Sequence, residues 1–454
     1  MDQPERVQRL EGGGVQLAQI QPAHHRPKGC VQFIDLPIPL HGKSLRSRPH
    51  SAAPAGPKLA RPARGTHPCP AARKIPSGIA QGLARPRRFT ETHGGTRVHR
   101  AGSPPRTRRF ALPEDLDTSA LEAAAELALA RGVSACQIAV AQNNRIVWTR
   151  SFGRATPDAR FWVASATKPI VSAAVWLLID AGSLDITQPV AHYIPAFAGE
   201  GKQTVTVEQV MLMTCGFPSA PMASVDGADP ERRVQQLARW PLEYAPGTRY
   251  VYHGMSAHWV LAELIERLSG QNFCDFIEER ITRPLGLPRV LGISRDQQSK
   301  IVQLADAGEE RALSAEADDG ALAAKIAAGE PGGGGVMTAA TLALFYQALL
   351  HNTGHLWSPE VLADGVGNVR CRLPDPLMNL PANRTLGVVV GAGFGATWAQ
   401  SSTAFGWPGA GGQIGFAEPA TGISCAFLQA GDPDQGSQFM RGVEMTNLAL
   451  ALGR

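Results

Sequence analysis

The segment Ser165-Ala166-Thr167-Lys168 places a serine and a lysine three residues apart. On a helix this spacing puts both side chains on one face, so the lysine amine lies beside the serine hydroxyl. A serine hydroxyl is a weak nucleophile at neutral pH and needs a neighbouring base. A lysine that is desolvated by apolar neighbours has a lowered pKa and can serve as that base. The spacing therefore predicts Ser165 as a nucleophile and Lys168 as its base.

The residues that follow supply the apolar surroundings. From Ile170 to Ile179 every residue except Ser172 is apolar, which predicts a buried helix that Gly182 can end. A lysine at the start of a buried helix is costly unless it is used. Because Ser165 lies where this helix begins, its backbone N–H can also stabilise an oxyanion. A Ser-x-x-Lys segment by itself is common by chance, so its catalytic interpretation depends on the buried helix that follows it.

Five segments of the chain, in order, resemble the serine β-lactamase and penicillin-binding-protein superfamily. They are SATKPIVSAAVWLLIDAGSLDITQPVAHYIPAF, VTVEQVMLMTCGFP, PGTRYVYHGMSAHWVLAELIERLSG, PGGGGVMTAATLALFYQALL and FGWPGAGGQIGFAEPATG. The branch they resemble most is that of class C β-lactamases and their esterase relatives. The resemblance spans about residues 112–454 and does not touch residues 1–110. It implies an α+β fold, with an antiparallel sheet flanked by helices plus an all-helical lobe, and an active site between the two.

The resemblance also assigns roles to Tyr252-His253-Gly254, which stands where the family has Tyr-x-Asn. By position, Tyr252 inherits the role of the tyrosine that passes a proton to the leaving group; the alternative is a core tyrosine on a loop. A nearby Lys168 ammonium would favour the phenolate of a side chain whose usual pKa is about 10. Gly254 replaces the asparagine that holds the substrate amide, which weakens the case for β-lactam turnover. His253 is either a substrate-binding residue or a solvated loop histidine.

The last segment contains Trp407-Pro408-Gly409-Ala410, where lactamases and peptidases of the family carry Lys-Thr-Gly or Lys-Ser-Gly. The resemblance implies that Trp407 and Gly409 bind substrate, with Trp407 an apolar wall in place of the cation that holds a substrate carboxylate. Such a wall suits neutral acyl esters. The backbone N–H of Ala410 would complete the oxyanion hole with that of Ser165. The alternative is a Gly-rich strand turn without catalytic meaning.

These residues predict a serine hydrolase that cleaves carboxylic esters, or amides, through an acyl-enzyme on Ser165. The alternatives are a β-lactamase or D-amino-acid peptidase, and a non-catalytic relative that uses the fold for binding. The expected partner is a small-molecule ester or amide, no metal or cofactor is implied, and the sequence does not give an oligomeric state. The glycines at 332–335 lack the Lys-Ser/Thr of a phosphate-binding loop, and a Gly-x-Ser-x-Gly elbow is absent.

Neighbouring elements must bring these residues together. Apolar spacing after Asp117 or Thr118 predicts a helix that Gly132 ends, and apolar runs around 142–144 predict a hairpin. Further expected elements are helices over 205–285, a surface helix over 303–330, a helix after 332–335, antiparallel strands over 385–430 and a helix over 438–452. Strands at both ends with helices between them favour an α+β body whose terminal strands share one antiparallel sheet.

Residues 1–110 differ from the rest of the chain in composition. They contain 20 of the 44 Lys/Arg residues, 5 of the 39 Asp/Glu and 15 of the 35 prolines, without lasting apolar periodicity. Such a segment cannot bury enough apolar surface to offset its chain entropy. We predict a disordered basic Pro/Arg-rich extension over 1–110 and a hydrolase domain over 111–454. The basic charge belongs to the extension, so it does not indicate a nucleic-acid-binding protein; an Arg-rich arm for an acidic partner is the alternative.

The N-terminus MDQPERVQRLEGGGVQ lacks a positive region followed by an apolar run, so no signal peptide is expected. The uncharged stretch 385–417 is broken by glycines and does not fit a membrane helix. Seven scattered cysteines without a Cys-x-x-Cys pair argue against a zinc site and agree with thiols in a reducing compartment. We expect a cytoplasmic location, with a periplasmic one as the alternative if the chain starts elsewhere.

A chain that begins at Ala111 should fold with essentially the melting temperature of the full-length protein and keep its ester-hydrolysis rate, because the extension adds no core. Thermal denaturation and turnover of a short-chain p-nitrophenyl ester measure this. An insoluble or inactive truncated protein would mean that residues 1–110 pack on the hydrolase domain.

Overall fold

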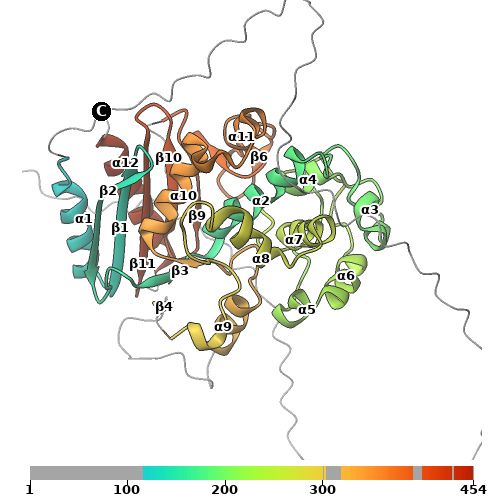
Figure 1. Cartoon of the computed structure of the whole chain (residues 1–454), viewed down its shortest axis with the longest axis horizontal. Coiled ribbons are helices and arrows are strands. Elements are labelled where there is room, and N and C mark those ends of the chain that lie inside the picture. The colour runs from blue at the N-terminus through green and yellow to red at the C-terminus, as the bar shows by residue number, and fades with distance from the viewer. Residues whose placement is uncertain (1–115, 300, 303–318, 392–400, 432–433, 453–454) are drawn as a thin grey trace, which may run out of the picture. The chain divides into compact units, whose positions relative to one another are not determined.

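The structure is a computed structural model and describes residues 116–299, 301–302, 319–391, 401–431 and 434–452. The extension predicted over 1–110 lies outside these ranges, as does 303–318 of the predicted surface helix. The described chain consists of a sheet covered by helices and an all-helical lobe beside it (Figure 1). This is the α+β architecture that the sequence predicts.

The main sheet is antiparallel and has the strand order β2-β1-β11-β10-β9-β8. Its strands are β1 (Ala135–Gln142), β2 (Arg145–Gly153), β8 (Val389–Val390), β9 (Phe405–Gly409), β10 (Gln413–Glu418) and β11 (Ile423–Ala430). Ala135 of β1 lies opposite Ala430 of β11. Strands from the two ends of the predicted 111–454 domain therefore share one sheet, as expected.

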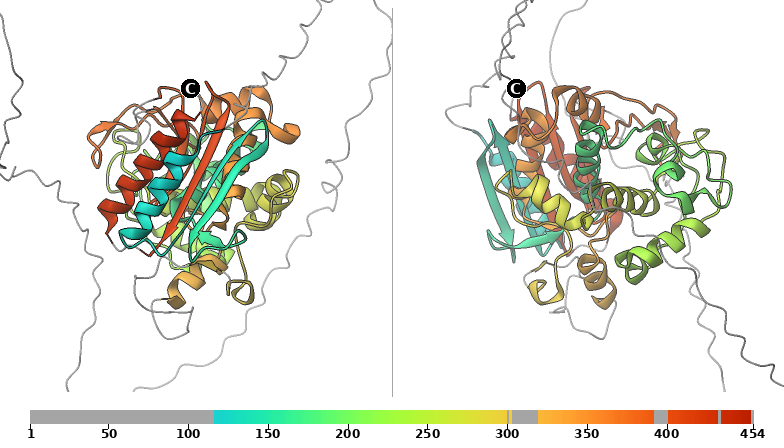
Figure 2. Two further views of the ribbon diagram at one scale, coloured as in Figure 1. Left: turned by 90° about the vertical axis from the view of Figure 1, so that its left-hand side faces the viewer. Right: turned by 45° about the vertical axis from the view of Figure 1, so that its right-hand side comes forward.

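Helices cover both faces of this sheet. The two helices α1 (Ser119–Ala130) and α12 (Gln435–Ala451) lie on one face, which Figure 2 shows from the front, and α10 (Ala339–His351) packs on the other. Because both faces are covered, β1 and β11 are buried along their whole length. The sheet is thus a core layer, and its side formed by β9 and β8 faces the helical lobe (Figure 1).

Local sequence signals explain where the first elements begin and end. The Asp117 carboxylate accepts a hydrogen bond from the Ser119 backbone N–H at 3.0 Å where α1 begins, and Gly132, with φ of 106°, ends it. Asn143 and Asn144 both have positive φ, the geometry of a tight two-residue hairpin between twisted strands. The helix and hairpin predicted here are confirmed.

The buried helix predicted after Ser165 is α2 (Lys168–Asp180), which packs against α7 (Ser256–Ser269). The other helices described are α3 (Val190–Tyr193), α4 (Val207–Met211), α5 (Ser224–Ala228), α6 (Pro230–Arg239), α8 (Phe273–Ile277), α9 (Asp319–Ala327) and α11 (Pro359–Val366). Short helical turns are η1 (Ala164–Thr167), η2 (Pro195–Ala198), η3 (Glu278–Thr282), η4 (Arg295–Gln297) and η5 (Thr353–His355). Small strands are β3 (Arg160–Trp162), β4 (Ile301–Val302), β5 (Val336–Met337), β6 (Pro374–Asp375) and β7 (Leu380–Pro381).

One boundary differs from the prediction. Helix α12 begins at Gln435 rather than near 438, because the Asp434 carboxylate accepts a hydrogen bond from the Ser437 backbone N–H at 2.7 Å and caps it there. Across the described ranges, no helix is both long and apolar enough to cross a bilayer. The cysteines in these ranges are free and buried, namely Cys136, Cys215, Cys274, Cys371 and Cys425.

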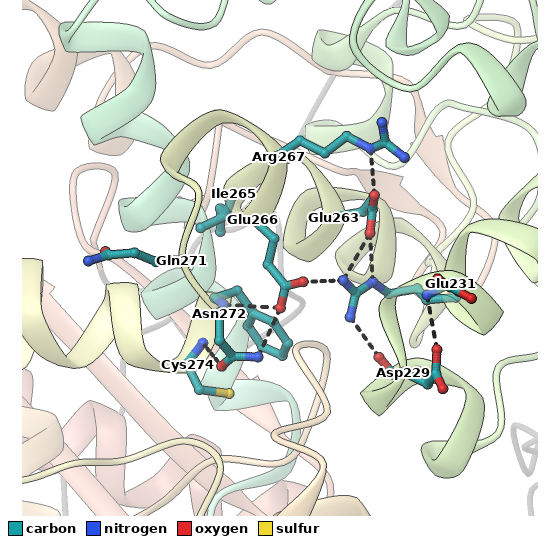
Figure 3. Close-up of polar contacts among 12 residues, drawn as sticks. Asp229, Glu231, Glu263, Ile265, Glu266, Arg267, Gln271, Asn272 and Cys274 are labelled. Atoms are coloured by element: carbon teal, nitrogen blue, oxygen red, sulfur yellow. Dashed lines mark hydrogen bonds and ion pairs between the residues drawn. The ribbon is translucent and has the colours of Figure 1, made fainter. Parts of the chain in front are cut away.

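A buried ionic network joins α6 to α7 (Figure 3). The Arg233 guanidinium on α6 is completely buried and donates to the Glu263 carboxylate at 2.9 Å and to the Gly227 carbonyl at 2.8 Å. It also pairs with Glu266, and Arg267 donates to the second Glu263 oxygen at 2.5 Å. Since α7 follows directly after the Tyr252 loop, this network fixes the helix on which that loop depends.

Replacing Arg233 with alanine should destabilise the protein by about 3–5 kcal/mol, because it removes the cation of Glu266 and leaves the buried Glu263 paired with Arg267 alone. Denaturant unfolding measures this. The control is Arg232→Ala, since Arg232 is 57% exposed in loose ion pairs and its loss should cost less than about 1 kcal/mol. Equal unfolding midpoints for the two variants would show that the network does not stabilise the lobe.

Candidate active site

Ser165 lies in the turn η1, which leads directly into α2. The preceding residue, Ala164, has φ of 45°, a conformation that costs a non-glycine residue roughly 1–3 kcal/mol. The Thr167 hydroxyl holds this turn: it donates to the Ala164 carbonyl at 2.6 Å and accepts from the Gly335 N–H at 2.9 Å. As a result Ser165 stays partly exposed at the start of a buried helix.

The side chain of Lys168 is only 1% exposed. Its amine donates to Ser165 Oγ at 3.0 Å and to the Gly332 carbonyl at 2.6 Å. In the residues that the structure describes, no carboxylate lies within ion-pair distance of it. Burial lowers the pKa of Lys168, and the Tyr252 phenol opposes this shift in part. The predicted desolvated lysine beside a serine is therefore present.

Tyr252 reaches the same serine from the loop before α7. Its phenol oxygen is 2.7 Å from Ser165 Oγ, and the Lys168 amine lies 5.1 Å from the centre of its ring. Burial acts to raise the pKa of Tyr252, but the Lys168 ammonium, the Ser165 hydroxyl and a further cation together outweigh it, so the pKa is lowered. Two proton-carrying groups thus converge on one hydroxyl, each with a lowered pKa.

The glycine run at 332–335, which the sequence shows not to be a phosphate loop, closes the site from another side. A Cβ at Gly332 would lie 2.8 Å from the Gly254 carbonyl oxygen, and one at Gly335 would lie 2.5 Å from Thr167 Oγ1. Both distances are too short for a side chain. The glycines therefore let this backbone approach closely enough for Gly332 to accept the hydrogen bond from Lys168.

Strand β9 borders the turn that carries Ser165. A Cβ at Gly409 would lie 2.3 Å from the Val163 carbonyl oxygen and 3.1 Å from the Ala166 nitrogen, so only glycine fits there. Ala410 follows directly after the strand and is exposed. The strand end and the nucleophile turn are therefore in direct contact.

Trp407 does not form the exposed wall that the sequence predicts. Its side chain is 1% exposed and stacks on the Tyr252 ring, with ring centres 6.2 Å apart and 26° between the planes. The Arg384 guanidinium lies 4.0 Å from the centre of the indole. Because β9 points this residue into the core, Trp407 supports Tyr252 from behind.

His253 is neither a solvated loop residue nor a substrate contact, and both expectations are wrong. It is completely buried; one ring nitrogen lies 2.6 Å from the Val251 carbonyl, and the other lies 3.2 Å from Cys215 Sγ and 3.3 Å from the Phe217 N–H. Burial lowers the pKa of His253 to about 4, so it is neutral at pH 7. Its ring fastens the Tyr252 loop to the turn at 215–217.

Two charged residues near the site were missed at the sequence level. Glu330, which directly precedes Pro331 and the glycine run, is 4% exposed, and burial raises the pKa of its carboxyl. Its position directly beside a Gly-rich apolar segment is a local signal that could have indicated a buried carboxylate. Arg384 lies in the polar stretch Ala382-Asn383-Arg384-Thr385, where no local pattern predicts a buried cation.

The β-lactamase family model matches residues 120–446, which is most of the chain. The chain belongs to the β-lactamase family. Membership confirms the predicted family and fold, and it places the chain among the serine hydrolases.

Known relatives lie on both the esterase and the peptidase side of this family. The esterase/β-lactamase LipL of Mycobacterium tuberculosis is 28% identical over 306 residues, covering 60% of this chain and 69% of LipL. A candidate D-alanyl-D-alanine carboxypeptidase of Escherichia coli K12 is 28% identical over 185 residues, but the match spans 34% of this chain and only 42% of that protein. The crystal structure of a family VIII carboxylesterase aligns with a TM-score of 0.63 at 22% identity, over 75% of this chain and 99% of that one. At this identity the structural likeness supports the shared fold alone.

Replacing Tyr252 with phenylalanine should lower turnover of an ester substrate by about 10²-fold, because it removes the proton carrier but keeps the ring that packs on Trp407. The melting temperature should stay unchanged. The matched control is Tyr346→Phe, because Tyr346 is a buried tyrosine on α10 whose hydroxyl approaches the Trp407 backbone rather than Ser165. Wild-type turnover in the Tyr252 variant would reduce that residue to a packing role.

Proposed function

We propose that this protein hydrolyses carboxylic esters through an acyl-enzyme formed on Ser165. One observation carries the proposal: the Lys168 amine at 3.0 Å and the Tyr252 phenol at 2.7 Å both meet Ser165 Oγ. A serine hydroxyl flanked by two groups with lowered pKa values is an activated nucleophile. A binding protein without catalysis has no need to keep this arrangement.

The geometry supports a double-displacement mechanism. Ser165 Oγ attacks the carbonyl carbon of the ester while its proton passes to the Lys168–Tyr252 pair, whose single shared proton belongs to the pair rather than to either group. The pair then returns the proton to the departing alcohol, which leaves the acyl group on Ser165. A water molecule attacks this acyl-enzyme, the pair accepts its proton, and the acid is released as Ser165 regains its hydrogen.

The oxyanion that forms in each attack needs two N–H donors. We assign these to the backbone of Ser165 and of Ala410, as the resemblance implies. The close approach of Gly409 to Val163 and Ala166 supports this assignment, because it brings the end of β9 to the turn that carries Ser165. Gly409 then borders the substrate through its backbone alone.

The side chains around the nucleophile favour esters over β-lactams and peptides. Position 254 has no side chain to hold a substrate amide, and a Cβ built there would meet nothing within 4 Å. Trp407 stands in place of a lysine and is itself buried. Lactamase or D-amino-acid peptidase activity is the second candidate, since the names of LipL and of the Escherichia coli relative include those activities.

We also propose a domain boundary near residue 111 and a cytoplasmic location. The family match begins at residue 120, which supports the boundary. The buried free thiols agree with a reducing compartment.

Replacing Ser165 with alanine should abolish both ester hydrolysis and labelling by a fluorophosphonate probe, at an unchanged melting temperature. Wild-type enzyme, Ser165→Ala and the control Ser172→Ala, a buried serine further along α2, are each given short-chain p-nitrophenyl esters, nitrocefin and a D-alanyl-D-alanine peptide. We expect ester turnover to exceed the other two in wild type and in the control. Faster nitrocefin or peptide turnover would favour the second candidate, and labelling of the Ser165 variant would place the nucleophile elsewhere.

A further inference from the structure

Arg384 is a buried cation with few polar partners. Its residue is 1% exposed, and its Nη2 donates to the Met211 carbonyl at 3.3 Å. Its Nε and Nη1 have no hydrogen-bond partner in the part of the chain that the structure describes, and no carboxylate there forms an ion pair with it. A buried charge without a counter-ion is costly, so proteins keep one where another contact or a function compensates.

One compensating contact is the indole of Trp407. The guanidinium carbon lies 4.0 Å from the centre of that ring, within the range of a cation–π interaction, for which tryptophan is the best partner. The same indole stacks on the Tyr252 ring, and the Tyr252 phenol meets Ser165 Oγ. A continuous path of contacts therefore leads from Arg384 through Trp407 to the reacting hydroxyl.

The charges around Tyr252 make this cation significant. Lys168 faces the phenol from α2, and Glu330 approaches Lys168 from the segment before the glycine run. His258 on α7 and His253 in the Tyr252 loop are buried, and burial lowers the pKa of both, so they carry no charge at pH 7.

Two weaker acids complete these surroundings. Burial raises the pKa of Tyr250 in the same loop to about 12, and Arg384 opposes this shift through its charge and a hydrogen bond to the phenol. Burial also raises the pKa of the Asp375 carboxyl on β6, so that it is a weaker counter-charge than an exposed aspartate. Lys168 and Arg384 are thus the two cations near the phenol.

We propose that Arg384 is a positioning residue for the hydrolysis: its guanidinium, held on Trp407, supplies a second fixed positive charge that favours the phenolate form of Tyr252 and keeps its ring directed at Ser165. The proposal rests on the proposed function. The lysine that Trp407 replaces in sequence is then compensated by a cation from another part of the chain, which acts on the tyrosine from behind the indole.

The test compares pH–rate profiles of kcat/KM for a neutral p-nitrophenyl ester in wild type, Arg384→Met, Arg384→Gln and Arg384→Lys. The Arg384 charge lowers the pKa of both members of the Lys168–Tyr252 pair. Its loss should therefore move the acid limb of the two neutral variants up by about one pH unit, with about tenfold lower activity below the limb. Activity above the limb should recover to near wild type. Arg384→Lys keeps the charge, and its limb should shift by less than about half a unit. The control Arg372→Gln removes an exposed arginine of the same region and should leave the limb in place.

Three results would overturn the proposal. A uniform loss of rate with an unmoved limb would mean that Arg384 only stabilises the fold. An unmoved limb with a raised KM confined to esters that carry a carboxylate would mean that it binds substrate. An acid limb in Arg384→Lys displaced as far as in the neutral variants would exclude the charge as the cause.

Two further measurements keep the proposal testable. If the neutral variants do not fold, a tyrosinate absorbance titration of wild type and Arg384→Lys, each against its Tyr252→Phe counterpart, reports the phenol directly. The two phenols should titrate within about half a pH unit of each other and below the usual tyrosine value of about 10, and a wild-type phenol that titrates at or above that value contradicts the proposal. If wild type cleaves no ester, the proposed function fails by itself. The pH dependence of fluorophosphonate labelling at Ser165 then tests Arg384 separately, with the same expected shift and the same contradicting result.

Discussion

The burial of the Lys168 amine is the constraint on which the rest of the site depends. An ammonium group out of water needs hydrogen-bond acceptors, and here they are Ser165 Oγ and the Gly332 carbonyl rather than a carboxylate. A carboxylate at contact distance would hold the amine protonated and remove its value as a base. The glycine run supplies a neutral acceptor instead, and Tyr252 shares the proton that the amine does not keep. The burial of Lys168 thereby accounts for the close approach of the glycine run, the position of Tyr252 and the partly exposed Ser165 between them.

Segments far apart in the sequence must meet for this to work. Ser165 and Lys168 come from the start of α2, Tyr252 from the loop before α7, and the remaining walls from the glycine run and β9. The packing of α2 on α7, the Arg233 network under α7 and the His253 contacts to the turn at 215–217 hold these pieces in place. The helical lobe therefore supports the tyrosine, and the sheet supports the serine turn.

The sequence pointed to Ser165 and Lys168 through a fixed spacing at a helix start, and to Tyr252 through the resemblance of its segment to the β-lactamase family. It also reached α1, the β1–β2 hairpin and the shared sheet, where caps, asparagine turns and apolar periodicity act over a few residues. It failed at positions whose burial and contacts are set by packing between segments far apart in the sequence. The sequence around Arg384 does not indicate that its side chain contacts Trp407. The burial of His253 and Trp407 depends on which side of the loop and of the strand faces the core. The glycine run lacks the Lys-Ser/Thr of a phosphate-binding loop, and the reason for its glycines, close approach to Gly254 and Thr167, exists only in three dimensions.

The most direct test of the account is to trap the covalent intermediate. Wild-type protein is mixed with a slowly hydrolysed ester, quenched in acid after a fraction of a turnover, digested and examined by mass spectrometry. We predict that the peptide containing Ser165 carries one acyl group, with the mass of the acyl part of the ester. This modified peptide should appear during the burst of alcohol release and disappear on further incubation. An acyl group on another residue, or full ester turnover with no acylated peptide at any quench time, would contradict it.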